Sequence, residues 1–436
     1  IIELKLKYRQ HNLIRKLICV AVLSEIPIEV WIAGVLALYM AWAIGANDVA
    51  NAMGTSVGSG ALTIGGAILV AAIFEFCGAF LAGGHVTDTV RKGMLDMALV
   101  GREQLIYGML ASLAAAGTLL IGATRFGLPV STTHAIVGAI VGFGAVGIGP
   151  DAVNWGKVGQ IVLSWLTSPL LAGVIAFAIF QITRSKILDT KDPIAQVRKF
   201  GPAFFFFVFF IIGLVTMFKG LKPLKLDLDF TEALIGSVIL GLVGSGLGIV
   251  LIRRVQLGPE DPSHRFSRVE RIFVVLQILT ACAIAFAHGS NDVANSIGPL
   301  AAVAYAVQGL DLSGKAPVAL WMLAIGGIGI VFGLATWGYR VMETVGKRIT
   351  ELTPSRGFAA QLAAATTIVL ASRLGIPIST THTLVGAVLG VGLARGINAV
   401  DLRVVGKIVA SWIATLPIAA GLSIFFYFFF KGLLTP

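Results

Sequence analysis

Two copies of a short polar string carry the side chains best suited to hold a cation. Gly45-Ala-Asn-Asp-Val-Ala-Asn51 returns as Gly289-Ser-Asn-Asp-Val-Ala-Asn295, and each copy directly follows a long apolar segment. Helical spacings of three and four residues place the Asn and Asp side chains of each copy on one face. Oxygen ligands with no His or Cys nearby suit a hard cation better than a transition metal. The candidate cation ligands are Asn47, Asp48, Asn51, Asn291, Asp292 and Asn295.

A second duplicated string could hold an anion. Gly127-Leu-Pro-Val-Ser-Thr-Thr133 and Gly375-Ile-Pro-Ile-Ser-Thr-Thr381 each precede an apolar run. A serine after an extended x-Pro-x stretch signals a helix N-cap, and a helix start offers unpaired N–H groups to a tetrahedral oxyanion. His134 and His382 follow on the first helical turn, where they could bond to backbone or substrate, or simply pack. The candidate anion ligands are Ser131, Thr132, Thr133, Ser379, Thr380 and Thr381.

The order of these strings indicates a tandem duplication. The cation strings are offset by 244 residues and the Ser-Thr-Thr-His strings by 248, while Val158–Trp165 returns as Val405–Trp412 at an offset of 247. We therefore divide the chain into an interfacial N-terminal segment (1–24), repeat 1 (25–182), a charged connector with two additional transmembrane helices (183–267) and repeat 2 (268–436). Duplicated halves are typical of secondary transporters, whose site lies near the bilayer midplane between the repeats.

The composition places the chain in a membrane. Of its 436 residues, 57% are hydrophobic and 13% are charged, whereas soluble domains are about 45–50% apolar and about 25% charged. The net charge of +11 lies in the breaks between apolar stretches, which indicates cytoplasmic loops and no nucleic-acid partner. About ten stretches approach the roughly 20 residues of a spanning helix: Ile28–Ile44, Ala67–Ala82, Ile106–Ile121, Val158–Phe180, Ala203–Phe218, Ala233–Ile252, Ile272–Ala287, Val318–Thr336, Phe358–Ala371 and Ile408–Phe430.

These observations predict an all-α polytopic membrane protein with about 10–12 transmembrane helices. By analogy with other carriers, we expect its two repeats to be inverted in the membrane. The stretches 130–147 and 378–394 could each cross fully or re-enter. Glycines around the cation strings favour broken helices whose freed carbonyls would add ligands. An aspartate at the bilayer centre costs about 2.5–3.5 kcal/mol on insertion scales, so Asp48 and Asp292 indicate function.

The motifs together resemble the inorganic phosphate transporter (PiT) family, which includes the sodium–phosphate cotransporters of animals. The resemblance rests on Gly45–Thr55, Gly289–Asn295 and the two Ser-Thr-Thr-His strings, and it covers both repeats. It implies a cell-membrane (plasma or inner membrane) carrier, often a homodimer, that moves phosphate with Na⁺ or, in some bacterial members, with H⁺. Na⁺ would be the coupling ion, with no other cofactor. The resemblance also implies a coupling role for Glu75, and the corresponding glutamate of the second repeat appears here as Gln361.

A charge count that is independent of this resemblance also favours cotransport. Phosphate and two aspartates bring several negative charges, neither motif pair contains Lys or Arg, and each helix dipole supplies only about half a charge. Cations should therefore complete the anion site, and only loaded or empty carriers should reorient in a symport by alternating access. The alternatives are a proton-coupled carrier of phosphate or metal-phosphate, a sulfate permease and a passive anion channel. We expect no enzyme, because no nucleophile elbow, His-Glu-x-x-His or Walker loop is present.

Overall fold

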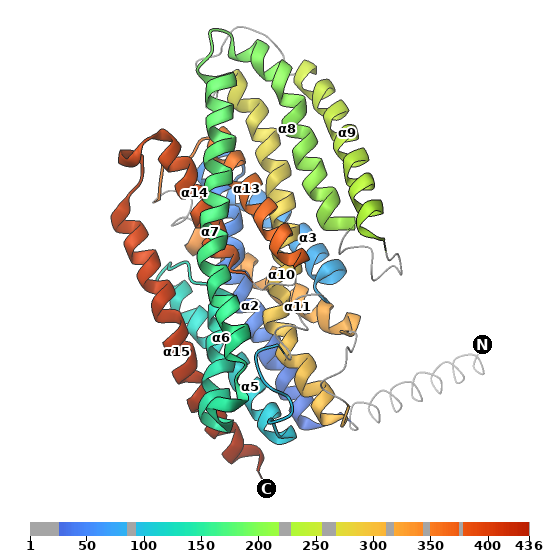
Figure 1. Cartoon of the computed structure of the whole chain (residues 1–436), viewed down its shortest axis with the longest axis vertical. Coiled ribbons are helices and arrows are strands. Elements are labelled where there is room, and N and C mark those ends of the chain that lie inside the picture. The colour runs from blue at the N-terminus through green and yellow to red at the C-terminus, as the bar shows by residue number, and fades with distance from the viewer. Residues whose placement is uncertain are drawn as a thin grey trace, which may run out of the picture.

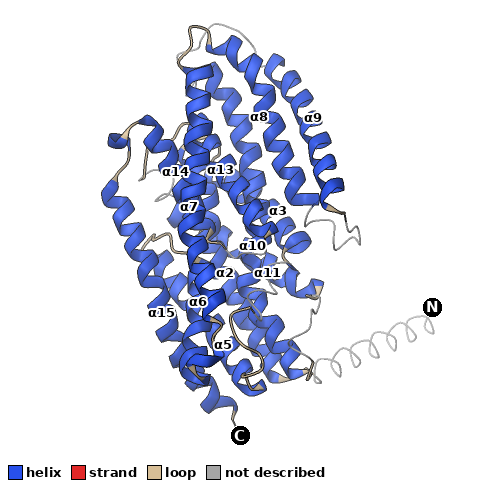
Figure 2. Ribbon diagram, viewed as in Figure 1, coloured by secondary structure: helices blue, strands red, loops and turns tan. Residues whose placement is uncertain are grey.

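The described part of the chain is built from helices (Figure 2). The computed structural model describes residues 26–84, 93–217, 228–254, 267–310, 318–342, 349–374 and 378–435, so the segment predicted at 1–24 lies outside it. Within these ranges, nine helices are long and apolar enough to cross a membrane. They are α2 (Ile28–Gly58), α3 (Ile64–Ala82), α5 (Arg102–Arg125), α7 (Trp155–Thr183), α8 (Pro193–Val215), α9 (Phe230–Arg254), α10 (Arg268–Val307), α11 (Leu320–Trp337) and α15 (Leu402–Leu434). The predicted all-α membrane architecture is confirmed.

Three further α-helices among the described residues pack in the bundle. The predicted stretch Phe358–Ala371 lies in α13 (Pro354–Arg373), which is not among the nine long apolar helices. The two Ser-Thr-Thr strings open α6 (Thr132–Phe143) and α14 (Thr380–Arg395), of 12 and 16 residues. At about 1.5 Å per residue these helices are shorter than the roughly 30 Å hydrocarbon core. Both begin at a buried serine inside the protein, and α6 continues through a π-helical turn to Ile148.

The duplication is visible in the arrangement of the helices. The sequence offsets pair α2 with α10, α6 with α14 and α7 with α15. In Figure 1, α7 runs upward to the turn that leads into α8, whereas α15 runs downward to the C-terminus. The short helices are exchanged between repeats, because α6 packs on α15 and α14 packs on α7. Between the repeats, α8 and α9 pack against each other as a hairpin.

Close helix crossings correct the prediction of broken helices at the cation strings. Both α2 and α10 run through their strings without interruption. The glycines serve packing instead: a Cβ on Gly45 would overlap the carbonyl oxygen of Ile330 on α11, and one on Gly289 would overlap that of Glu75 on α3. A helix break therefore does not free the backbone of these strings. Pro299 has no N–H, however, so the Asn295 carbonyl lacks its helical donor and joins the side chains as a group available to a ligand.

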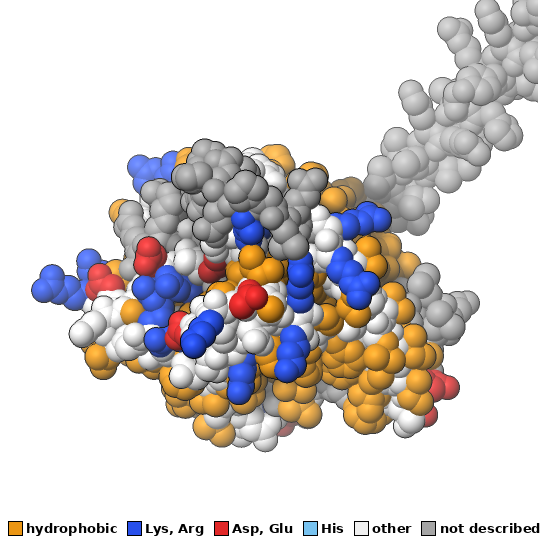
Figure 3. Space-filling model, turned by 90° about the horizontal axis from the view of Figure 1, so that it is seen from above, with side chains coloured by type: hydrophobic (Ala, Val, Ile, Leu, Met, Phe, Trp, Pro, Cys, Tyr) orange, Lys and Arg blue, Asp and Glu red, His pale blue; other side chains and the backbone are white. Residues whose placement is uncertain are grey.

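One end of the molecule carries exposed basic side chains. Viewed from above, Lys and Arg side chains are scattered over the face where α7 ends and α8 begins (Figure 3). The exposed basic residues at the ends of α7, α8 and α9 include Lys186, Lys191, Arg198, Arg253 and Arg254. Cytoplasmic loops carry an excess of Lys and Arg, so this end fits the cytoplasmic side of a membrane.

Candidate functional site

The two aspartates of the cation strings lie in direct contact with the two Ser-Thr-Thr helix starts. Asp48 accepts hydrogen bonds from Thr132 Oγ1 at 2.8 Å and from Thr381 Oγ1. Asp292 accepts one from Thr380 Oγ1 at 2.8 Å. All five side chains are at most 4% exposed. The aspartate of repeat 1 is thus bonded by both repeats, and the predicted cation and anion ligands form one site.

The two helix starts interlock with each other across the repeats. Ser131 and Ser379 are N-caps, as predicted. Ser131 Oγ accepts from the His134 N–H at 3.2 Å, and Ser379 Oγ accepts from the His382 N–H at 3.1 Å. Thr133 Oγ1 donates to the Ile378 carbonyl at 3.1 Å, just before the opposite cap. Thr381 Oγ1, which donates its hydrogen to Asp48, lies 3.4 Å from the Val130 carbonyl in the reciprocal contact. Each cap is therefore held in place by the other repeat.

The asparagines of the two strings are in unequal surroundings. Asn47 braces the chain before α6, because its Oδ1 accepts from the Val130 N–H at 3.2 Å and its Nδ2 donates to Thr124 Oγ1 at 2.9 Å. Asn291 Nδ2 donates to Asp292 Oδ1 at 2.7 Å, and its buried Oδ1 has no donor among the described residues. Asn295 Nδ2 reaches the Thr132 and Thr133 hydroxyls at 3.3 and 3.5 Å. The side chain of Asn51 lies outside the described part of the chain.

A histidine that the motif analysis missed stands at the centre of the carboxylates. His288 directly precedes the second cation string, so the expectation of no nearby His was wrong. Its Nδ1 lies 3.0 Å from Glu75 Oε2, and its Nε2 lies 2.8 Å from Asp292 Oδ2 and 3.8 Å from Asp48 Oδ1. The repeat could not reveal it, because the first copy has Ile44 at this position. One ligand atom from each of His288, Asp48 and Asp292 falls within 4.8 Å of the others, a spacing that could hold a metal ion.

Comparison with known proteins decides the family. The model of the phosphate transporter family matches residues 44–423, which include both strings and both helix starts. The chain belongs to the phosphate transporter family. It is 49% identical to a putative phosphate permease of Haemophilus influenzae over 403 residues, covering 92% of this chain and 96% of that protein. It is also 45% identical to inorganic phosphate transporter 2-1, chloroplastic, of Arabidopsis thaliana, covering 91% of this chain and 71% of that protein.

A solved structure shares the architecture of this transporter. The protein described as the sodium-dependent phosphate transporter superposes with a TM-score of 0.86 at 41% identity, covering 93% of this chain and 100% of that one. With this family and architecture, the chain is a multi-pass membrane protein that transports phosphate, and it is not an enzyme.

In this transporter, Gln361 is not the positional counterpart of Glu75, which corrects the sequence assignment. Glu75 lies three residues before Gly78, whose Cβ would overlap the carbonyl of Phe286 on α10. The equivalent glycine of repeat 2 is Gly333, which meets α2 in the same way, and Ile330 lies three residues before it. The assignment of Gln361 as the counterpart of Glu75 failed because it relied on the similarity of the two side chains. The position of a residue along its helix, relative to the helix crossing, decides which residues correspond. At these matching positions α3 and α10 carry Glu75 and His288, whereas α11 and α2 carry Ile330 and Ile44.

Gln361 instead ties three helices together on the side of the site nearer Gly58. Its Oε1 accepts from Thr280 Oγ1 at 2.9 Å, and its Nε2 donates to Ser56 Oγ at 2.7 Å. Gln277 makes a similar contact one turn further on, at the C-cap of α2, where its Oε1 accepts a hydrogen bond from Ser59 Oγ at 2.7 Å. These buried amides form a polar ladder along the second half of α2.

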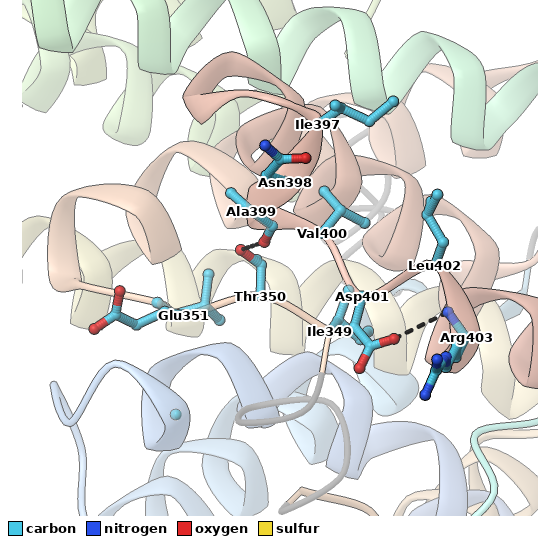
Figure 4. Close-up of a pocket in the computed structure, with 12 residues that line it drawn as sticks. Ile349, Thr350, Glu351, Ile397, Asn398, Ala399, Val400, Asp401, Leu402 and Arg403 are labelled. Carbon is cyan, nitrogen blue, oxygen red and sulfur yellow. Dashed lines mark hydrogen bonds between the residues drawn. The ribbon is translucent and has the colours of Figure 1, made fainter.

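A cavity of about 930 Å³ lies at the end of this ladder, beside Gly58 and the chain that joins α14 to α15 (Figure 4). On its wall the Asp401 N–H donates to the Ile349 carbonyl at 3.1 Å, and Thr350 Oγ1 donates to the Ala399 carbonyl at 2.7 Å. None of the candidate ligands lines it. In repeat 1 the equivalent segments are joined by an isolated β-bridge between Leu95 and Val153.

Proposed function

We propose that this phosphate transporter is a Na⁺-coupled symporter with a single shared site at the two helix starts. The observation that carries the proposal is the direct contact between both aspartates and both Ser-Thr-Thr starts, deep within the bundle. Hydroxyls and helix N-termini favour a tetrahedral oxyanion, whereas the adjacent carboxylates repel it. Phosphate can therefore bind well only when cations sit among these carboxylates.

The charges of the site support coupling to more than one cation. Asp48, Asp292 and Glu75 surround one imidazole, so even a charged His288 leaves an excess of negative charge when the carboxylates are ionised. Phosphate adds one to two negative charges. Oxygen ligands suit Na⁺, and two buried oxygens, Glu75 Oε1 and Asn291 Oδ1, lack a donor among the described residues. The solved relative is sodium-dependent, which supports the same ion here.

The transport cycle follows from the arrangement of the repeats. We propose that the two repeats are inverted across the membrane, since α7 and α15 run in opposite directions (Figure 1). The shared site would then be exposed to each side in turn by alternating access. The homodimer implied by the family resemblance stays a prediction, which the mass of the detergent-solubilised protein tests.

One observation favours proton coupling as the second candidate. His288 lies between Glu75 and Asp292, where an imidazole can accept and release a proton. The passive anion channel and the sulfate permease have no comparable support. A carboxylate can accept the O–H of protonated phosphate, whereas sulfate has no such donor, so we expect sulfate to compete weakly.

Uptake into proteoliposomes tests these possibilities. Labelled phosphate is offered with a Na⁺ gradient, a pH gradient, or neither, and with excess sulfate as competitor. We expect uphill uptake driven by Na⁺ and its loss in Asp48→Asn and Asp292→Asn. Uphill uptake driven by the pH gradient alone would establish the proton-coupled candidate, and the absence of uphill uptake would indicate a channel. Normal Na⁺ dependence in both variants would refute the assignment of these aspartates.

A further inference from the structure

Behind the two helix starts, four aromatic rings form one cluster, in which His134, His382 and Trp165 are buried and Trp412 is half-buried. The His134 ring lies 3.7 Å from the Trp165 ring, and the His382 ring lies 3.5 Å from the Trp412 ring, measured between centroids. The two imidazoles meet edge to face at 4.3 Å. Each histidine directly follows a Ser-Thr-Thr string, so the cluster lies beside both predicted phosphate ligands.

Hydrogen bonds in this cluster cross between the repeats. His382 Nδ1, on α14 of repeat 2, lies 3.3 Å from the Trp165 carbonyl on α7 of repeat 1. His134 Nδ1, on α6, lies 3.5 Å from the Trp412 carbonyl on α15. Pro169 explains why the Trp165 carbonyl is available, because proline has no N–H to donate to the residue four positions earlier. Each histidine thus stacks on one long helix and bonds to the other.

The two carbonyl acceptors determine which nitrogen of each imidazole carries the hydrogen. A carbonyl oxygen can only accept, so Nδ1 of each histidine carries the hydrogen. The Nε2 atoms of His134 and His382 and the Nε1 atoms of Trp165 and Trp412 are buried and have no partner among the described residues. The contacts that hold the cluster are therefore the Nδ1–H bonds and ring stacking, and the indole N–H groups take no part in them.

We infer that this cluster is a positioning device that sets the spacing of the two helix starts and thereby the affinity for phosphate. This inference rests on the proposed phosphate site at those starts. The histidines do not touch phosphate; they act through Ser131–Thr133 and Ser379–Thr381, which each precede them in the chain. When an Nδ1–H bond is lost, the helix start is free to shift against the long helices, and the hydroxyls of the two strings no longer converge.

Substitutions that place an amide nitrogen at the position of either Nδ1 or Nε2 of the histidine test this positioning role. The Nδ2 of asparagine reproduces the position of histidine Nδ1, and the Nε2 of glutamine reproduces that of Nε2. We compare His382→Asn, His382→Gln and His382→Ala in proteoliposomes, with KM for phosphate, maximal rate and half-saturating Na⁺ measured separately. His382→Asn keeps the hydrogen-bond donor but loses the stacked ring, so we expect it to raise KM clearly less than His382→Gln and His382→Ala, which should raise it about five- to tenfold. Maximal rate and half-saturating Na⁺ change little in all three.

A second variant separates positioning from direct binding. In Trp165→Phe the stacking surface remains while the unused indole N–H is removed, so we expect a native KM. A raised KM in Trp165→Phe, or a native KM in His382→Gln together with a raised one in His382→Asn, would mean that the free nitrogens bind phosphate and would overturn the inference. Native kinetics in His382→Ala would overturn it too. Failure of the proposed function is distinct, since the native protein would then show no Na⁺-driven uptake.

Discussion

The unequal crossings of the two repeats make a double-mutant experiment decisive for the buried His288–Glu75 pair. At this crossing repeat 1 supplies Glu75 and repeat 2 supplies His288, whereas the equivalent crossing holds Ile44 and Ile330. The protein thus shows that an apolar pair fits this geometry. We compare His288→Ile, Glu75→Ile and the combined variant.

The structure gives the order of the effects. His288→Ile leaves Glu75 with 0% exposure and removes the 3.0 Å partner of Oε2, while Oε1 already lacks a donor among the described residues. Breaking a buried pair in this way costs about 3–5 kcal/mol. Glu75→Ile costs less, because His288 keeps Asp292 at 2.8 Å. Replacing both residues removes the orphaned Glu75 carboxylate, while Asp292 loses His288 in the double variant as it does in His288→Ile and keeps its bonds from Thr380 and Asn291. We therefore expect the double variant to cost about 1–2 kcal/mol less than His288→Ile.

Thermal unfolding of the purified protein in detergent measures these differences. All variants are heated at one scan rate, because membrane proteins seldom refold and their Tm then depends on rate. We expect the Tm of the double variant to lie above that of His288→Ile by several degrees. A double variant that unfolds at or below the Tm of His288→Ile would refute the reasoning, since the pair would then not be compensating for a buried charge.

Three further predictions concern packing, closure and the polar ladder. Gly45→Ala should lower Tm and folded yield strongly, because its Cβ would overlap the Ile330 carbonyl, whereas Gly122→Ala meets nothing within 4 Å and should leave both unchanged. Cysteines at Leu95 and Val153, which form a β-bridge, should be crosslinked by an oxidant in a background without the native cysteines. Uptake should then stop and return on reduction; unimpaired uptake in the crosslinked protein would show that this bridge need not open. Gln361→Glu removes the amide N–H groups that donate to Ser56 Oγ and the Ala52 carbonyl, so Tm should fall by several degrees; an unchanged Tm would show that the ladder does not stabilise the bundle.

The sequence predicted the parts of the site that lie in duplicated motifs. The serine N-caps could be read locally, because capping depends on neighbouring residues alone. His288 could not be found this way, since its counterpart is Ile44 and its partners are distant in sequence. Gly45 was interpreted as a helix breaker because the sequence does not reveal which helix passes close to it. The aromatic cluster was missed for a related reason, since Trp165 and Trp412 meet the histidines only after the repeats have exchanged their short helices.

The exchange of short helices between the repeats has a consequence for the synthesis of the protein and its insertion into the membrane. The long partner of α6 is α15, which begins about 260 residues later and is the last of the described helices. At roughly 5–20 residues per second, the ribosome needs about 13–50 s to supply it. During that interval the cap at Ser131, with its cluster of hydroxyls, must stand in a half-built bundle without the helix that covers it. The first repeat therefore stays incomplete until α15 has been made and has packed on α6.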